Sequence, residues 1–226
     1  MALVNIQKGV TTPNNDDEPK REMKIRRRRG TRVLLSVLII WGLAVVIAAE
    51  TGLFRALPPL LLAPLIALGI AVPVVVYAMT PGFRAYIAAV GLRPLTAFHI
   101  WRIGAAFVFF WYGAHNLLPE TFVQNAGWGD FIAGCLAIVV LLLPESRRGY
   151  LIFHLVGFAD FVLAVGTGLA LFLLKDPRMA AIQTLPMALI PLYGVGISGA
   201  NHIMAFDLLR RGSLRACNAK HASANA

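Results

Sequence analysis

The sequence predicts an all-α, polytopic integral membrane protein: a bundle of six transmembrane helices that follows a disordered basic N-terminal tail. Three observations support this fold class. The chain of 226 residues is 58% hydrophobic and only 14% charged, whereas soluble domains carry about 25% charged residues. Its apolar residues form runs near the length of about 20 that crosses a bilayer as a helix. Its basic residues gather in the tails and in alternate loops.

Residues 1–32 form the predicted tail. They hold nine of the 21 Lys and Arg residues and include the polar stretch TTPNNDDEP. A segment with so little to bury is expected to be disordered. The first apolar run, 33–49, is interpreted as an uncleaved anchor and not as a signal peptide, because the basic region before it is long and the run has the length of a span.

Five further apolar runs follow the first. Only helices satisfy the backbone of such segments within hydrocarbon, so each run is predicted to be a helix. The predicted spans are 33–49, 57–79, 95–118, 128–143, 150–174 and 185–209, and residues 210–226 form a C-terminal tail. The short amphipathic segment 82–91 is expected to lie along the membrane interface.

The basic residues predict the orientation of these spans. In a six-span arrangement both tails share one side with Arg84, Arg93, Arg147 and Arg148. The opposite side holds only Arg55, Lys175 and Arg178. The positive-inside rule then places both termini in the cytoplasm, with the protein in a cell inner membrane. With a net charge of +10, the tails are expected to attract anionic lipids; no nucleic-acid partner is expected.

Polar residues on three spans are expected to meet in the cytoplasmic half of the bundle. A charge within the bilayer costs at least about 2.5–3.5 kcal/mol and persists only with a partner. At 1.5 Å per residue, Arg102 and Asp160 reach similar depths, so we predict that they form an ion pair. This pair has either a functional role or only a structural one. The predicted neighbours are His99, His154, Ser198, Asn201 and His202.

A second polar group is expected towards the outer face, and it comprises His115, Asn116 and Asp130. Asp130 directly precedes the apolar part of the fourth span. A carboxylate there is typical of a helix N-cap, which accepts backbone N–H groups and complements the helix dipole. We therefore interpret Asp130 as the cap of the fourth span.

Three functions are compatible with this pattern. The first is a small transporter or permease-like component, with Arg102 and Asp160 as its charged core. The second is a membrane redox subunit in which His154 and His202 hold haem b or a metal ion. The third is a non-catalytic accessory or assembly subunit, bound to another membrane protein or to a second copy of itself.

Enzymatic activity is not expected. The stretch GISG at 196–199 matches the serine motif of rhomboid proteases, in which a histidine on a later helix activates the serine. Here no later span follows, and a buried serine without a positioned base is inert.

Overall fold

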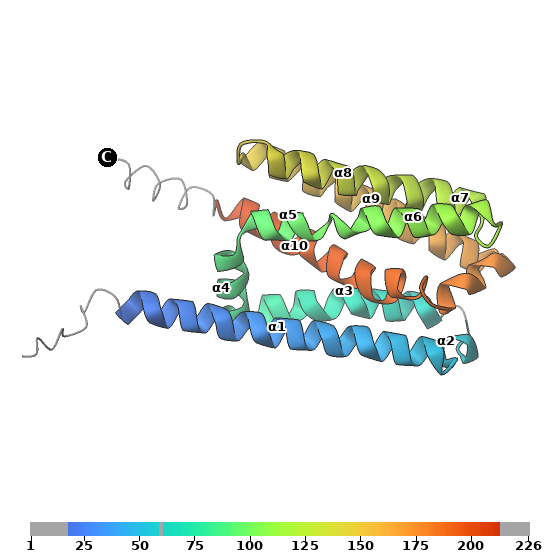
Figure 1. Cartoon of the computed structure of the whole chain (residues 1–226), viewed down its shortest axis with the longest axis horizontal. Coiled ribbons are helices and arrows are strands. Elements are labelled where there is room, and N and C mark those ends of the chain that lie inside the picture. Colours follow the sequence, from blue (N-terminus) through green and yellow to red (C-terminus); the bar gives the residue numbers. More distant parts are fainter. Residues whose placement is uncertain (1–17, 59–60, 213–226) are drawn as a thin grey trace, which may run out of the picture.

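The computed structural model describes residues 18–58 and 61–212, and within these ranges it contains helices and no strands (Figure 1). The first helix, α1 (Glu18–Glu50), starts inside the predicted basic tail. Its first turns are rich in Glu, Lys and Arg, which favour the helical conformation. Adding residues to an existing helix costs little free energy compared with starting a new one. Residues 1–17 of the predicted tail and most of the C-terminal tail lie outside the described residues.

The remaining elements alternate long helices with short connecting turns. In chain order after α1 they are α2 (Leu53–Ala56), α3 (Leu62–Met79), α4 (Pro81–Val90), α5 (Leu92–Phe98), α6 (Trp101–Ala114), α7 (Glu120–Phe122), the π-helical η2 (Val123–Gly127), α8 (Trp128–Leu142), α9 (Arg147–Leu173), the 3₁₀ helix η3 (Pro177–Gln183), the π-helical η4 (Ile190–Gly194) and α10 (Val195–Arg210).

Within the described residues, five helical stretches are long and apolar enough to cross a membrane. They are Arg27–Glu50, Leu62–Met79, Leu92–Ala114, Glu120–Leu142 and Arg147–Leu173. The predicted sixth span corresponds to η4 and α10. α10 alone has 16 residues and carries buried Ser198, Asn201 and His202, so it is shorter and more polar than the other five.

α10 lies in the middle of the bundle. It packs against α3 on one side and against α9 and α5 on the other, and it crosses the view obliquely between them (Figure 1). α1 covers the α3 side, whereas α6, α8 and α9 form the other side. This central position explains why α10 tolerates polar residues, because neighbouring helices surround most of its surface.

The beginning of α1 and the end of α10 lie at the same end of the bundle, and α4 lies across that end (Figure 1). We call it the basic end. It carries Arg84, Arg93, Arg147, Arg148, Arg210 and Arg211. A core of buried apolar residues, which includes Leu95, Tyr150 and Leu208, fills the basic end. A second apolar core, around Phe109, Phe122 and Met187, fills the opposite end.

Glycines set the close approach of α3 and α10. A Cβ added to Gly196 would lie 2.8 Å from the carbonyl oxygen of Gly69 and 2.7 Å from the ring of Trp41. The backbone of α3 cannot move away without disturbing the packing around it, because protein interiors are close-packed. Small residues at such contacts are typical of helices that associate within membranes.

We therefore expect Gly196→Ala to destabilise the fold by about 1–3 kcal/mol, the usual cost of overpacking. The measurement is thermal unfolding in detergent. Gly166→Ala on α9 is the matched control, because a Cβ there meets nothing within 4 Å. Equal unfolding temperatures for the unmodified protein and both variants would contradict the proposed close contact.

Candidate functional site

Arg102 is the charged centre of the bundle. It lies in the first turn of α6, in the middle of the stretch Leu92–Ala114, and it is only 3% exposed. Its Nε donates a hydrogen bond to Oδ1 of Asp130 at 2.7 Å, and its Nη2 donates to Oδ2 of Asp160. Its Nη1 donates to the carbonyl oxygen of Gly157 at 3.3 Å. One guanidinium thus connects α6, α8 and α9, and the predicted Arg102–Asp160 ion pair is present in the structure.

Asp130 is not the N-cap that the sequence suggested. The helical segment starts at Glu120 and continues through η2 into α8, so Asp130 lies well inside the helix and not at its free end. No side-chain hydrogen bond caps the start of α8. The interpretation as a cap, and with it the placement of Asp130 in an outer-face group, was wrong because η2 extends the helix beyond the predicted boundary.

Gly129 brings the second carboxylate close to α8. A Cβ at this position would overlap the carboxylate of Asp160. Glycine therefore leaves the space that lets Asp130 and Asp160, from two helices, share one guanidinium. We call Arg102, Asp130 and Asp160 the ionic triad.

The ionic triad carries a net charge of −1 when both carboxylates are ionised. Asp130 is 9% exposed, and its partner Arg102 is more deeply buried still. An uncompensated charge in such surroundings is costly. The arrangement therefore favours the uptake of one positive charge, either a proton on a carboxylate or a metal cation nearby.

Three histidines form a second group, which we call the histidine triad: His99, His154 and His202. They come from the turn between α5 and α6, from α9 and from α10, and all three are fully buried. One ring nitrogen of each lies within 4.8 Å of the others. Nδ1 of His154 and Nδ1 of His202 are 3.0 Å apart. The sequence placed all three among the predicted neighbours of the Arg102–Asp160 pair, with His154 and His202 as candidate metal ligands, and in the structure the three rings lie together.

Several ring nitrogens of the histidine triad lack a hydrogen-bond partner. Both nitrogens of His99 and Nε2 of His202 are buried and unpaired among the described residues. Nε2 of His154, in contrast, lies 3.3 Å from the hydroxyl oxygen of Thr96. Buried polar groups are nearly always paired, so the unpaired nitrogens mark a site where a further ligand would be stabilised.

The histidine triad leaves no room for haem b between His154 and His202. Two axial bonds of about 2 Å to one iron place the ligating nitrogens about 4 Å apart, with the porphyrin plane between the rings. The facing nitrogens of these two histidines are only 3.0 Å apart. The donor set fits a compact metal ion better than it fits a haem.

The two triads meet at Gly157 on α9. Its carbonyl oxygen accepts the hydrogen bond from Arg102. A Cβ at Gly157 would lie 2.7 Å from Cε1 of His202 and 3.5 Å from Nη1 of Arg102. The absence of a side chain therefore allows the imidazole and the guanidinium to approach each other. The six residues of the two triads are continuous, and we call them the buried polar cluster, although Asp160 is only partly buried.

Irregular helical turns surround this cluster. α5 ends at Phe98, and the N–H groups of His99, Ile100, Arg102 and Ile103 each bond to the carbonyl oxygen three residues earlier. This tight turn is the break between α5 and α6 in Figure 1. The π-helical turns η2 and η4 lead directly into α8 and α10, which carry Asp130 and His202. Such turns inside long helices are frequent at functional sites.

Two of the predicted neighbours do not join the cluster. The hydroxyl of Ser198 is buried and accepts a hydrogen bond from the indole N–H of Trp101 at 3.3 Å. Asn201 is buried on α10, but among the described residues no hydrogen bond connects it to either triad.

His115 and Asn116 lie at the opposite end of the bundle, exposed and away from Asp130. Nδ1 of His115 is 2.7 Å from the carbonyl oxygen of Trp111. Asn116 accepts a hydrogen bond from Arg178 at 3.3 Å. Hydrogen bonds from Arg178 also lower the pKa of the Asp176 carboxyl, so this pair stays ionised at neutral pH. These groups form local contacts at a helix end.

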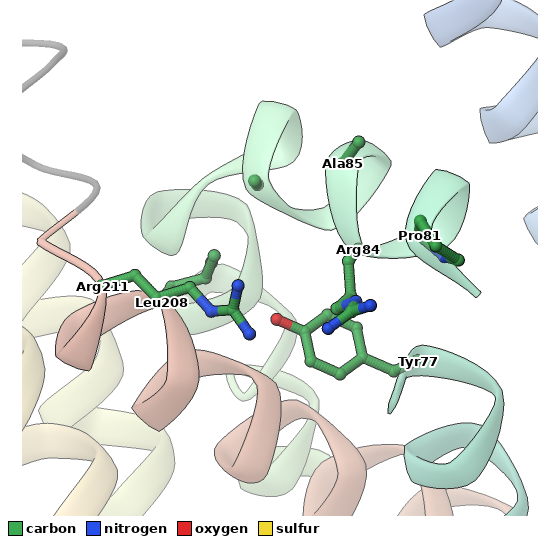
Figure 2. A pocket seen from close by; sticks show the side chains of 7 residues that line it. Tyr77, Pro81, Arg84, Ala85, Leu208 and Arg211 are labelled. Atoms are coloured by element: carbon green, nitrogen blue, oxygen red, sulfur yellow. The ribbon is translucent and has the colours of Figure 1, made fainter. Parts of the chain in front are cut away.

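A pocket of about 360 Å³ opens at the basic end, apart from the buried polar cluster. Figure 2 shows the guanidinium groups of Arg84 and Arg211 near the phenolic oxygen of Tyr77. That phenol donates a hydrogen bond to Asp207 at 2.7 Å, and Arg211 donates to the same carboxylate at 2.7 Å. The pocket is lined by Tyr77, Pro81, Arg84, Ala85, Ala88, Leu208 and Arg211. Arg84 and Arg211 bring positive charge to this pocket, and the carboxylate of Asp207 offsets that of Arg211.

We expect Arg102→Gln to be strongly destabilising, because it leaves two carboxylates facing each other without a cation. Removing one partner of a buried pair costs about 3–5 kcal/mol. The additional replacement of both carboxylates, Asp130→Asn and Asp160→Asn, should recover much of this loss. Unfolding temperatures and yields in detergent test both expectations. An Arg102→Gln variant as stable as the unmodified protein would show that the ion pairs do not hold the helices together.

The comparisons with known proteins bear on the family only. Residues 59–210, about two thirds of the chain, match the family described as a domain of unknown function, DUF8737. Neither the curated proteins nor the solved structures include a match. All six residues of the buried polar cluster lie within the matched segment, whereas α1 and α2 precede it. The chain therefore belongs to the family of the domain of unknown function DUF8737.

Proposed function

We propose that the protein is a six-span membrane protein that binds and releases a cation, in the first place a proton, at its ionic triad, as part of a transport process. The observation that carries this proposal is the pair of carboxylates, from α8 and α9, that share the single guanidinium of Arg102. Intramembrane acids and histidines are typical of proton relays in pumps and transporters.

The alternation of the long helices supports the six-span topology. The oblique path of η4 and α10 returns the chain to the basic end, where α1 begins. The excess of arginines at that end favours the cytoplasmic side of an inner membrane. The pocket between Arg84 and Arg211 would then face the headgroups of the inner leaflet, where anionic lipids concentrate. We include anionic lipid among the proposed partners for this reason.

The charge balance of the ionic triad supports proton binding. One bound proton makes the triad neutral, whereas its release leaves one negative charge between α6, α8 and α9. The release therefore adds a second ion pair to Arg102 but leaves an uncompensated negative charge in a poorly solvated site, which favours the entry of another cation. A ligand shifts a conformational equilibrium only through such a difference between states. The irregular turns at His99–Ile100 and in η2 are places where the helices can change direction.

The topology predicts the behaviour of reporter fusions. A fluorescent protein fused after Arg211 should be fluorescent, and alkaline phosphatase fused there should be inactive, because both report a cytoplasmic location. Alkaline phosphatase fused after Lys175, between α9 and η3, should be active. An active phosphatase at the C-terminus would contradict the orientation, and equal behaviour at both sites would contradict the six-span arrangement.

Proton binding predicts an infrared signal of a buried protonated carboxyl group. In pH-difference spectra of the protein reconstituted in vesicles, this C=O band should vanish in Asp130→Asn or in Asp160→Asn, whichever residue holds the proton. Asp176→Asn is the matched control, since that carboxylate lies in a partly exposed pair with Arg178 at the opposite end. A spectrum without a protonated carboxyl band at any pH would contradict the proposed function.

A further inference from the structure

We propose that His99, His154 and His202 form a binding site for a divalent transition-metal ion such as Zn²⁺ in the interior of the bundle. This inference goes beyond the proton-binding role of the ionic triad, because it rests on different residues. The donor set consists of three neutral imidazoles from three separate parts of the chain. Imidazole nitrogen suits Zn, Cu, Fe and Ni, whereas Mg²⁺ and Ca²⁺ prefer oxygen ligands.

The spacing of the ring nitrogens fits such an ion. With metal–nitrogen bonds of about 2.0–2.1 Å and tetrahedral angles, ligating nitrogens lie about 3.3–3.4 Å apart. The facing nitrogens of His154 and His202 are 3.0 Å apart, and no pair of candidate ligand atoms is more than 4.8 Å apart. Small rotations of the rings, of His99 above all, bring all three nitrogens to bonding distance from a common point.

The hydrogen bond to Thr96 determines which nitrogen of His154 carries the lone pair that a metal ion would take over from His202. When Nε2–H of His154 donates to the hydroxyl oxygen of Thr96, its Nδ1 carries a lone pair directed at Nδ1 of His202. A histidine ligand usually has its second nitrogen held in this way, which fixes the ring and its tautomer. Thr96 is itself fully buried, so it is placed to orient His154 as a ligand.

The unpaired nitrogens are the second, independent observation. His99 has neither of its nitrogens hydrogen-bonded, although its ring is completely enclosed. Its ring lies against that of His202, with 4.1 Å between the centroids. Leaving buried polar groups unpaired destabilises the fold, and coordination of a metal ion would give one nitrogen of His99 a partner.

The ionic triad lowers the cost of a cation at this position. Its net charge of −1 lies on the other side of Gly157, where Arg102 and His202 approach each other. The positive guanidinium is the group nearest to the histidines, but two carboxylates hold it and more than balance its charge. The opposite possibility is that the three rings only pack against Phe153 and Phe158, and it predicts no metal binding.

The experiment uses the full chain, purified in detergent through a tag without histidines and stripped of metal with a chelator. Co²⁺, a spectroscopic substitute for Zn²⁺, is titrated in, and Zn²⁺ is counted by mass spectrometry after desalting. We expect the intense visible absorption of tetrahedral Co²⁺, its displacement by Zn²⁺, and a single bound ion per chain. Thr96→Val should weaken Zn²⁺ binding by about 10–100-fold, the usual effect of losing such an orienting group.

The variants His99→Gln, His154→Gln and His202→Gln should each abolish the Co²⁺ spectrum. His115→Gln should leave it unchanged, because His115 is exposed at the opposite end of the bundle. Asp160→Asn should retain the metal site with lower affinity, and this variant separates the metal site from the proton site. If a histidine variant does not fold, metal binding by the unmodified protein and by Thr96→Val still tests the proposal.

Two results would overturn the proposal. One is a stripped, correctly folded protein that binds neither Co²⁺ nor Zn²⁺. The other is metal that binds equally well to the three triad variants and to the unmodified protein, which would mean that it is held elsewhere.

Discussion

The guanidinium of Arg102, held between the carboxylates of Asp130 and Asp160, is the interaction on which the interior of this bundle depends. It joins three long helical stretches near their midpoints, and two of them depend on a glycine to take part. α8 needs the glycine at position 129 so that Asp160 can come close. On α9, the carbonyl oxygen of Gly157 accepts a hydrogen bond from the same guanidinium. The apolar cores at the two ends then pack around this fixed point.

The histidines extend the polar interior towards the basic end. Two chain segments share the same order: an apolar side chain of the basic-end core, then a histidine, then a charged residue of the ionic triad. Leu95, His99 and Arg102 show this order in the third apolar segment, and Tyr150, His154 and Asp160 show it in α9. The interior is therefore layered, and a cation in one polar layer affects the energy of charges in the other.

Much of this arrangement could be predicted from the sequence. Hydropathy located the helices, and counting residues from their ends placed Arg102 and Asp160 at one depth and so predicted their pairing. Asp130 was misplaced because its position depends on where its helix starts, and the π-helical η2 has no clear signal in the sequence. The sequence also predicted His99, His154 and His202 as neighbours of this pair, but the direct contact of the three rings depends on how α5, α9 and α10 rotate about their axes. The break at His99–Ile100 changes that rotation, and hydropathy cannot reveal it.

The basic-end core has a kinetic consequence for anything bound at the histidines. Leu95, Tyr150 and Leu208 lie between the rings and the nearest end of the bundle, and the last two are 1% exposed. No hydrated ion can pass side chains packed this closely unless the helices separate. The rates at which a metal ion enters and leaves would then depend on how often the bundle opens, and not on the strength of the metal–imidazole bonds. A metal ion that binds while the helices assemble would stay bound for as long as the protein remains folded.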